Sequence, residues 1–211
     1  MSARESILAG VRSAIGNHGD ACEAEYAAIA RDYRHHGQLG AEEILNLFAS
    51  RLQDYDAGVY LCQPGEVPQT VAAAMAARGK TSLLRPANLP EEWLPASHLL
   101  PAVDGLSYEE IDRAEGVITG CVAAIAFTGT IILRHSLADG RRALTLIPDY
   151  HLCIVSTSQV VETVPEGFAM LKGMETMPLT TVSGPSATAD IEMNRVKGVH
   201  GPRFLDVILV G

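Results

Sequence analysis

The sequence predicts an α/β protein in which a largely parallel sheet follows an N-terminal helical extension. From Gly58 onward, short apolar runs alternate with helical stretches, and this alternation is typical of a parallel sheet with helices on its faces. The first 55 residues contain helical patterns alone. Because 211 residues suit one α/β domain with such an extension, we expect a helical extension over residues 1–55 and an α/β domain over residues 56–211, packed as one compact unit.

The extension is expected to contain three helices. The first spans residues 2–15, where Ser2 can cap the helix and Glu5 stands at the capping-box position. Two more are expected over residues 23–34 and 41–54, and the last has the stronger pattern because its apolar residues fall on one side. We expect this helical start to pack on the core or on another subunit.

The α/β domain is expected to alternate strands and helices. Strands are predicted over residues 58–62, 81–84, 97–100, 121–127, 130–134, 144–147, 152–155, 179–182 and 204–210. Helices are predicted over residues 67–78, 108–115 and 165–174. Ser107 and Glu110 stand at capping-box distance at the start of the second of these helices.

The composition argues against several classes of function. The chain has 16 basic and 25 acidic residues, so its net charge of −9 repels phosphate backbones and argues against a nucleic-acid partner. No run approaches 18 apolar residues, which argues against a membrane span, and the N-terminus has no long apolar signal-peptide core. We therefore expect a cytoplasmic protein. Residues 119–211 are nearly neutral, and a small anion would be tolerated best there.

The four cysteines argue against a bound metal. Cys22, Cys62, Cys121 and Cys153 lie far apart without any CxxC spacing. A zinc or iron–sulfur site normally takes two ligands from one short turn. We expect no metal and no cofactor, and we interpret the cysteines in apolar runs as buried free thiols.

A chemically crowded loop lies near the C-terminus. Residues 183–192 and 198–202 contain two Gly-Pro turns, hydroxyls, carboxylates and a histidine between two apolar strand-like runs. Gly and Pro shape such a loop, and small polar side chains on a rigid turn can present hydrogen bonds to a ligand. The alternative is that two tight turns simply connect strands.

Several residues could carry chemistry. Residues 128–130, T-G-T, become interesting if the fold brings them beside Ser183, although a tight turn or β-bulge explains them alone. His200 could move a proton near neutrality, or could anchor a turn. Asp190 and Glu192 would face the same side of an extended segment, where they could hold a metal or polar ligand or be solvated.

These motifs together resemble the LUD-domain family, and within it the lactate-utilisation protein C branch. The motifs are T-G-T after an apolar strand, S-G-P-S-x-T-A-D-I-E, and G-V-H-G-P-R before the last strand. The resemblance covers residues 58–211, with the helical start included. It implies the fold of the sugar-phosphate isomerase and CoA-transferase superfamily, a Rossmann-like open, largely parallel sheet. It also implies a non-redox component of bacterial oxidation of L-lactate to pyruvate, acting with iron–sulfur proteins A and B, with a homo-oligomer possible.

The resemblance also implies a set of ligand-binding residues. These are Thr128, Gly129, Thr130, Ser183, Gly184, Pro185, Ser186, Asp190, Glu192, His200 and Gly201. Family members often have A-E-T-G-T where this chain has Phe127 before T-G-T. Since Phe127 cannot act as a nucleophile or a base, covalent acyl transfer from this position is excluded.

Three functional hypotheses follow from these residues. The first is the non-redox component, which binds a small organic anion or its partner proteins. The second is an enzyme acting on a small phosphorylated or carboxylated substrate, with His200 or Asp190 as acid–base, and it depends on analogy of fold alone. The third is an interaction protein whose helical start mediates oligomerisation.

Overall fold

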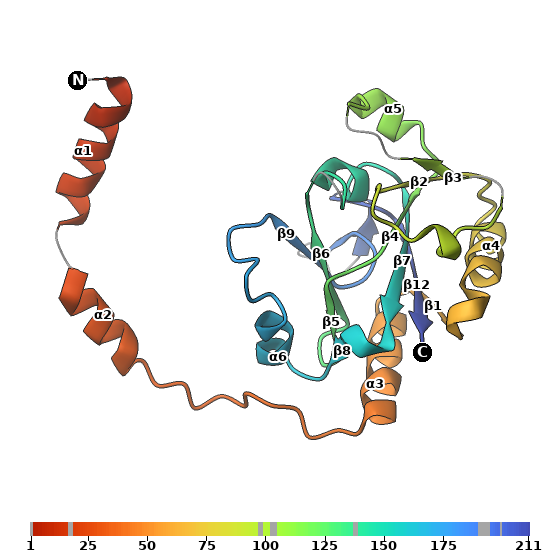
Figure 1. Ribbon diagram of the computed structural model, residues 1–211, viewed down its shortest axis with the longest axis horizontal. Coiled ribbons are helices and arrows are strands. Elements are labelled where there is room, and N and C mark those ends of the chain that lie inside the picture. The colour runs from red at the N-terminus through yellow and green to blue at the C-terminus, as the bar shows by residue number, and fades with distance from the viewer. Residues whose placement is uncertain are drawn as a thin grey trace. The chain divides into compact units, whose positions relative to one another are not determined.

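The computed structural model describes residues 2–16, 19–96, 99–101, 105–136, 139–189, 195–198 and 200–211. Contacts divide the chain into two compact units, residues 1–33 and residues 34–211 (Figure 1). The helical extension was predicted to end at residue 55, whereas the first compact unit ends at residue 33. Helix α3 (Ala41–Asp54), between the two limits, packs on the α/β unit through Phe48 and Leu52, both fully buried.

The N-terminal unit contains two helices, α1 (Ala3–Ile15) and α2 (Gly19–Ala28). The predicted capping box forms in α1, because the Glu5 N–H donates to Ser2 Oγ at 3.2 Å and the Ser2 N–H donates to Glu5 Oε2 at 2.7 Å. None of the side chains of α1 is buried, and its apolar face remains exposed. No helix within the described residues is long and apolar enough to cross a membrane.

Six described strands form the main sheet, and all neighbours in it run parallel. Their order is β1 (Gly58–Cys62), β12 (Phe204–Val210), β7 (Tyr150–Ser156), β4 (Val117–Thr119), β2 (Leu83–Arg85) and β3 (Leu99–Pro101). The connections include helices α4 (Val67–Ala77) and α5 (Tyr108–Asp112) and the short 3-10 turns η1 (Pro64–Glu66) and η2 (Glu91–Trp93). This arrangement confirms the predicted Rossmann-like open, largely parallel sheet with N-terminal helices.

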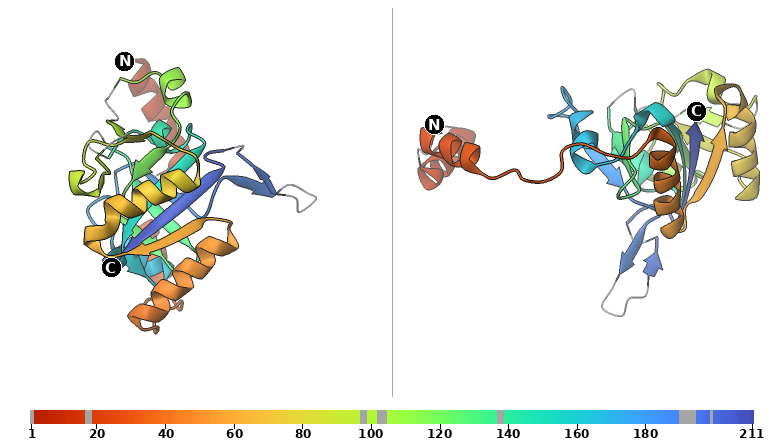
Figure 2. Two further views of the ribbon diagram at one scale, coloured as in Figure 1. Left: turned by 90° about the vertical axis from the view of Figure 1, so that its right-hand side faces the viewer. Right: turned by 90° about the horizontal axis from the view of Figure 1, so that it is seen from below.

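A second sheet of four described strands packs against the main sheet. Its order is β8 (Val160–Val161), β5 (Ala123–Ile125), β6 (Thr130–Arg134) and β9 (Leu179–Val182). The connections include η3 (Arg142–Thr145), η4 (Thr157–Gln159) and α6 (Val164–Ala169). A separate hairpin, β10 (Ala187–Ala189) with β11 (Arg195–Lys197), projects from the rest of the α/β unit (Figure 2).

The core has two faces because the central strands β7 and β12 are buried on both sides. Alternate residues of β7, Tyr150, Leu152 and Ile154, pack with α4. The residues between them, such as Cys153 and Val155, pack with α3 and the second sheet. The nearly continuous apolar sequences of β7 and β12 suit this burial on both faces, as expected for a buried parallel sheet.

One charged residue lies inside this core. Asp206, on β12, is fully buried and accepts hydrogen bonds from Arg78 Nε at 3.0 Å and Arg78 Nη2 at 2.6 Å. The Tyr150 hydroxyl donates to the same carboxylate at 3.0 Å, and burial followed by the charge of Asp206 raises the pKa of this hydroxyl. These partners satisfy the carboxylate, as a buried charge requires.

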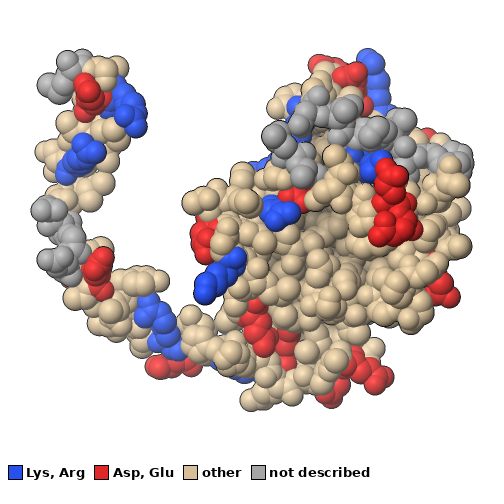
Figure 3. All heavy atoms as spheres, viewed as in Figure 1, with Lys and Arg blue, Asp and Glu red and all other residues tan. Residues whose placement is uncertain are grey.

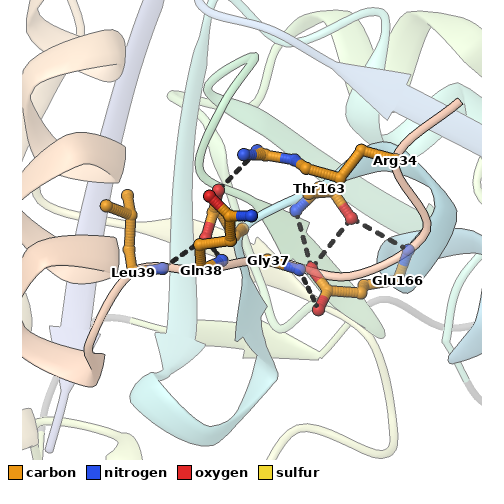
Figure 4. Close-up of polar contacts among 7 residues, drawn as sticks. Arg34, Gly37, Gln38, Leu39, Thr163 and Glu166 are labelled. Carbon is orange, nitrogen blue, oxygen red and sulfur yellow. Dashed lines mark hydrogen bonds and ion pairs between the residues drawn. The ribbon is translucent and has the colours of Figure 1, made fainter.

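Two carboxylates anchor the start of the α/β unit. Glu162, after β8, accepts hydrogen bonds from the backbone N–H groups of residues 38–39 at 2.5 and 2.7 Å, and Arg34 Nη2 lies 2.5 Å from its Oε1. Glu166 of α6 accepts a bond from the Gly37 N–H at 2.8 Å (Figure 4). These contacts fix residues 34–39 on β8 and α6.

Several predicted elements differ from the structure. The strand predicted over residues 144–147 is wrong: this segment belongs partly to η3, and the 3-10 turn buries Leu144 and Thr145 without strand pairing. The sequence prediction missed β4, which has only three residues and directly follows the helix predicted up to residue 115. Helix α6 is shorter than the helix predicted over residues 165–174.

Candidate functional site

The predicted loop forms one wall of a pocket of about 300 Å³. We call it the loop pocket, and its lining consists of residues 180–186, residues 200–202, Arg142, Thr145, Leu146, His151 and Leu205. It lies near the amino ends of β7 and β12, since His151 and Leu205 are the second residues of these strands. Of the predicted ligand residues, Ser183, Gly184, Pro185, Ser186, His200 and Gly201 line it.

The fold brings the T-G-T turn beside Ser183. Strands β6 and β9 pair antiparallel, and this register places the start of β6 opposite the end of β9. Thr130 Oγ1 consequently lies 2.7 Å from Ser183 Oγ and 2.7 Å from Thr128 Oγ1. Residues 128–130 therefore lie beside Ser183, as a shared ligand site would require. The hydroxyls of Thr128, Thr130 and Ser183 form a hydrogen-bonded chain that ends at the loop pocket.

The rest of the loop is held by backbone contacts to Ser186. The Ser186 N–H donates to the Pro202 carbonyl at 2.8 Å, and the Gly198 N–H donates to the Ser186 carbonyl at 3.0 Å. The His200 N–H donates to Ser186 Oγ at 3.0 Å. These bonds position the exposed His200 at the edge of the pocket, where its ring can meet a ligand.

Two of the predicted ligand glycines face protein instead of open space. A Cβ on Gly184 would lie 2.4 Å from Tyr55 Cβ, and one on Gly129 would lie 2.8 Å from Arg51 Cβ. Both residues have positive φ, +89° and +60°, which favours glycine. Their glycine requirement thus comes from close packing against the end of α3.

Three functional side chains of the loop pocket were not predicted as ligand residues. His151 is 2% exposed and its Nε2 lies 2.8 Å from Thr119 Oγ1, and burial lowers its pKa to about 4. Arg142 is exposed, and the described residues give it no ion-pair partner. Thr145 is buried and donates to the Arg142 carbonyl at 3.2 Å. The arginine-bearing, nearly neutral C-terminal part of the chain was the one signal for an anion site that the sequence offered.

Charge does not gather into a single patch on the visible face. Figure 3 shows Asp and Glu side chains interspersed with Lys and Arg, with broad uncharged regions between the charged groups. Several charges of the α/β unit are already paired, including Arg203 with Asp149 and Arg134 with Asp139. Arg142, by contrast, lines the loop pocket without a carboxylate partner among the described residues.

Other predicted residues do not contribute to the described lining of the loop pocket. Asp190 and Glu192 fall outside the described residues. Thr128 lines a surface hollow with Phe127 and the end of α3, and Phe127 is 57% exposed. Among the residues that the structure describes, no three His, Cys, Asp or Glu side chains gather as a metal ion would require.

Comparison with known proteins places the chain in a family. A family model described as the LUD domain matches residues 41–210. Lactate utilization protein C of Deinococcus radiodurans is 46% identical over 176 residues, which cover 82% of this chain and 82% of that protein. Lactate utilization protein C of Bacillus pumilus is 28% identical over 233 residues, which cover 96% of this chain and 94% of that protein.

A solved structure agrees with this placement. The crystal structure of a DUF162 family protein from Deinococcus radiodurans matches with a TM-score of 0.71 and 40% identity, and it covers 82% of this chain and 100% of that chain. The resemblance noted in the T-G-T, S-G-P and V-H-G-P motifs is thereby confirmed. Because the family model matches most of its length, the chain belongs to the LUD domain family.

Proposed function

We propose that this protein is a non-redox component of a bacterial L-lactate utilisation system, which oxidises lactate to pyruvate, and that it binds a small organic anion in the loop pocket. The names of relatives that match most of the chain support the role in lactate utilisation. The observation that carries the binding role is the meeting of an unpaired arginine with several hydroxyls in one pocket.

The chemistry of the lining suits a carboxylate. Arg142 supplies a positive charge, and the hydroxyls of Ser183 and Ser186 can donate hydrogen bonds. A volume of about 300 Å³ is at the small end of ligand pockets, which suits a small organic anion. Leu205 and Leu146 add an apolar surface for the carbon atoms of the ligand.

The iron–sulfur lactate-utilisation proteins A and B are the partners that we propose for the assembled system. Phe127 and Phe168 are each 57% exposed, and large exposed apolar side chains are common at interaction surfaces. Purified protein would be mixed with A and B and separated by size. We expect co-elution with at least one of them, and elution of all three alone would contradict the partnership.

Calorimetric titration tests the anion site. L-Lactate and pyruvate are expected to bind, whereas the uncharged lactamide should bind much more weakly because it has no charge to pair with Arg142. Arg142→Gln should weaken anion binding by about tenfold or more, since a hydrogen bond to a charged group contributes about 1.5–3 kcal/mol.

Arg113→Gln is the matched control, because Arg113 is exposed and lies outside the loop pocket. It should leave the affinity unchanged. Equal affinities for lactate and lactamide, or an unchanged affinity in Arg142→Gln, would refute the anion site. A saturating ligand at 100 times its dissociation constant should also stabilise the fold by about 2.7 kcal/mol.

A further inference from the structure

The strand order creates a topological switch point at the carboxyl ends of β2 and β4. β2 and β4 are neighbours, with Leu84 paired to Val117. After β2 the chain continues to β3, which neighbours β2 on the side away from β4. After β4 the chain passes through β5 and β6 of the second sheet and then enters β7, which neighbours β4 on the side away from β2. In open α/β sheets the crevice between such diverging connections is the usual place for a ligand. The loop pocket, by contrast, lies at the amino ends of its strands.

A second pocket of about 200 Å³ lies at this switch point. We call it the switch pocket. Pro86, Asn88 and Trp93 line it from the segment that follows β2, and Thr119 and Gly120 line it from the end of β4. Nothing in the residue pattern had predicted it, because its walls come from segments whose proximity depends on the strand order.

Gly120 contributes backbone without a side chain to the lining of the switch pocket. A Cβ built on this residue would have Trp93 Cζ3 at 3.9 Å and the Ile154 carbonyl at 4.0 Å as its nearest neighbours. These are ordinary contact distances, so the protein itself does not require glycine there. A ligand, however, could approach this bare backbone closely and reach the partly buried indole ring of Trp93.

The charges that border the switch pocket cancel one another. Arg134 pairs with Asp139 through Nε–Oδ2 at 2.5 Å and Nη2–Oδ1 at 2.9 Å, and Asp139 also accepts bonds from Asn88 and from Ser136. Burial, the largest cause, lowers the pKa of His135, whose Nε2 lies 2.8 Å from a threonine hydroxyl. The described lining thus has no unpaired charge for an anion.

We propose that the switch pocket is a second ligand site, which takes an uncharged planar nitrogen heterocycle such as an adenine or nicotinamide ring. The ring lies over the backbone of Gly120 and against the indole of Trp93, with Leu89 and Val122 as further apolar contacts. The Asn88 side-chain carbonyl, whose amide nitrogen is held by Asp139, accepts a hydrogen bond from the edge of the heterocycle. This site adjoins the proposed anion site at Thr145, which lines both pockets, but the remaining described lining residues of the two pockets differ.

Tryptophan fluorescence gives a direct measurement, because Trp93 is the one tryptophan of the chain. Adenine and nicotinamide would each be titrated into the full-length protein, with inorganic phosphate and L-lactate as anionic probes. At least one heterocycle should quench the emission saturably, whereas the two anions should leave it unchanged. Trp93 lines the switch pocket and not the loop pocket. Its emission therefore reports this site while calorimetric titration with L-lactate reports the anion site, so failure of one site is distinguishable from failure of the other.

Gly120→Val fills the proposed ring position and should weaken heterocycle binding by about tenfold, or about 1.4 kcal/mol. Gly120→Ala, with ordinary contact distances for its Cβ, should fold normally and weaken binding less, which keeps the test decisive if the valine variant does not fold. Gly65→Val is the matched control, because space at Gly65 is open and it does not line the switch pocket.

Three results would overturn the proposal. The first is the absence of saturable quenching by either heterocycle. The second is quenching by the anionic probes alone, which would assign the switch pocket to an anion. The third is an unchanged heterocycle affinity in a folded Gly120 variant.

Discussion

Acidification is expected to destabilise the α/β unit through His151. This side chain on β7 is 2% exposed, and its Nε2 lies 2.8 Å from the hydroxyl of Thr119 on β4. Burial lowers its pKa to about 4, compared with about 6.5 for an unperturbed histidine. The unfolded chain therefore takes up a proton at a pH where folded His151 is still neutral.

The sign and size of the effect follow from proton linkage. Above about pH 6.5 neither state binds the proton and His151 costs nothing, whereas the free energy of unfolding falls as the pH drops from about 6.5 towards 4. With folded and unfolded pKa values of about 4 and about 6.5, the loss is about 2 kcal/mol at pH 5. The loss levels off at about 3.5 kcal/mol well below pH 4, since each pKa unit corresponds to about 1.4 kcal/mol.

Urea unfolding at about pH 7.5 and about pH 5 measures this term. Other groups also titrate, so the informative quantity is the difference between wild-type protein and His151→Gln in their loss of stability between the two pH values. The glutamine variant should lose about 2 kcal/mol less than the wild type. His200→Gln, at an exposed histidine, should retain the wild-type loss. If His151→Gln loses as much stability as the wild type, the proton-linkage reasoning is refuted.

Two further substitutions test the packing. Arg78→Met leaves Asp206 buried without its cation and should destabilise the protein by about 3 kcal/mol in urea unfolding. Arg203→Met should cost far less, because the ion pair of Arg203 is exposed. Equal losses of stability in the two variants would contradict the role of burial. Gly184→Ala should be destabilising by about 1–3 kcal/mol because its Cβ would meet a tyrosine at the end of α3. Gly173→Ala has a similar φ of +86° but open space, so thermal unfolding should show a smaller loss, and a loss as large as that of Gly184→Ala would assign the effect to backbone strain.

The sequence predicted local structure well where one pattern dominated. The strands at Gly58–Cys62, Thr130–Arg134 and Phe204–Val210 match the prediction residue for residue, because each is a short, mainly apolar run. It failed at residues 144–147, since burial of apolar residues in a 3-10 turn gives the same short run as a strand.

The candidate site was only partly predictable. The hydroxyl of Ser183 and the T-G-T turn could be named from composition, but their contact depends on the antiparallel pairing of β6 with β9. Arg142 was indicated only as one of several arginines in the nearly neutral C-terminal part of the chain, and His151 was not indicated at all, because nothing in their own segments distinguishes a pocket residue from an ordinary surface or core residue. Gly129 and Gly184, which were predicted to contact a ligand, instead pack against residues at the end of α3.

The sequence by itself determined the fold class, the family and the loop that borders the loop pocket, because periodicity, turn residues and short motifs are properties of neighbouring residues. Only the tertiary structure decided the strand order, and with it the position of the switch pocket between β2 and β4. It also decided that His151 is buried and neutral while Arg142 stays exposed. The reason is physical: desolvation and ligand geometry depend on which distant segments pack together, and no local pattern encodes that packing.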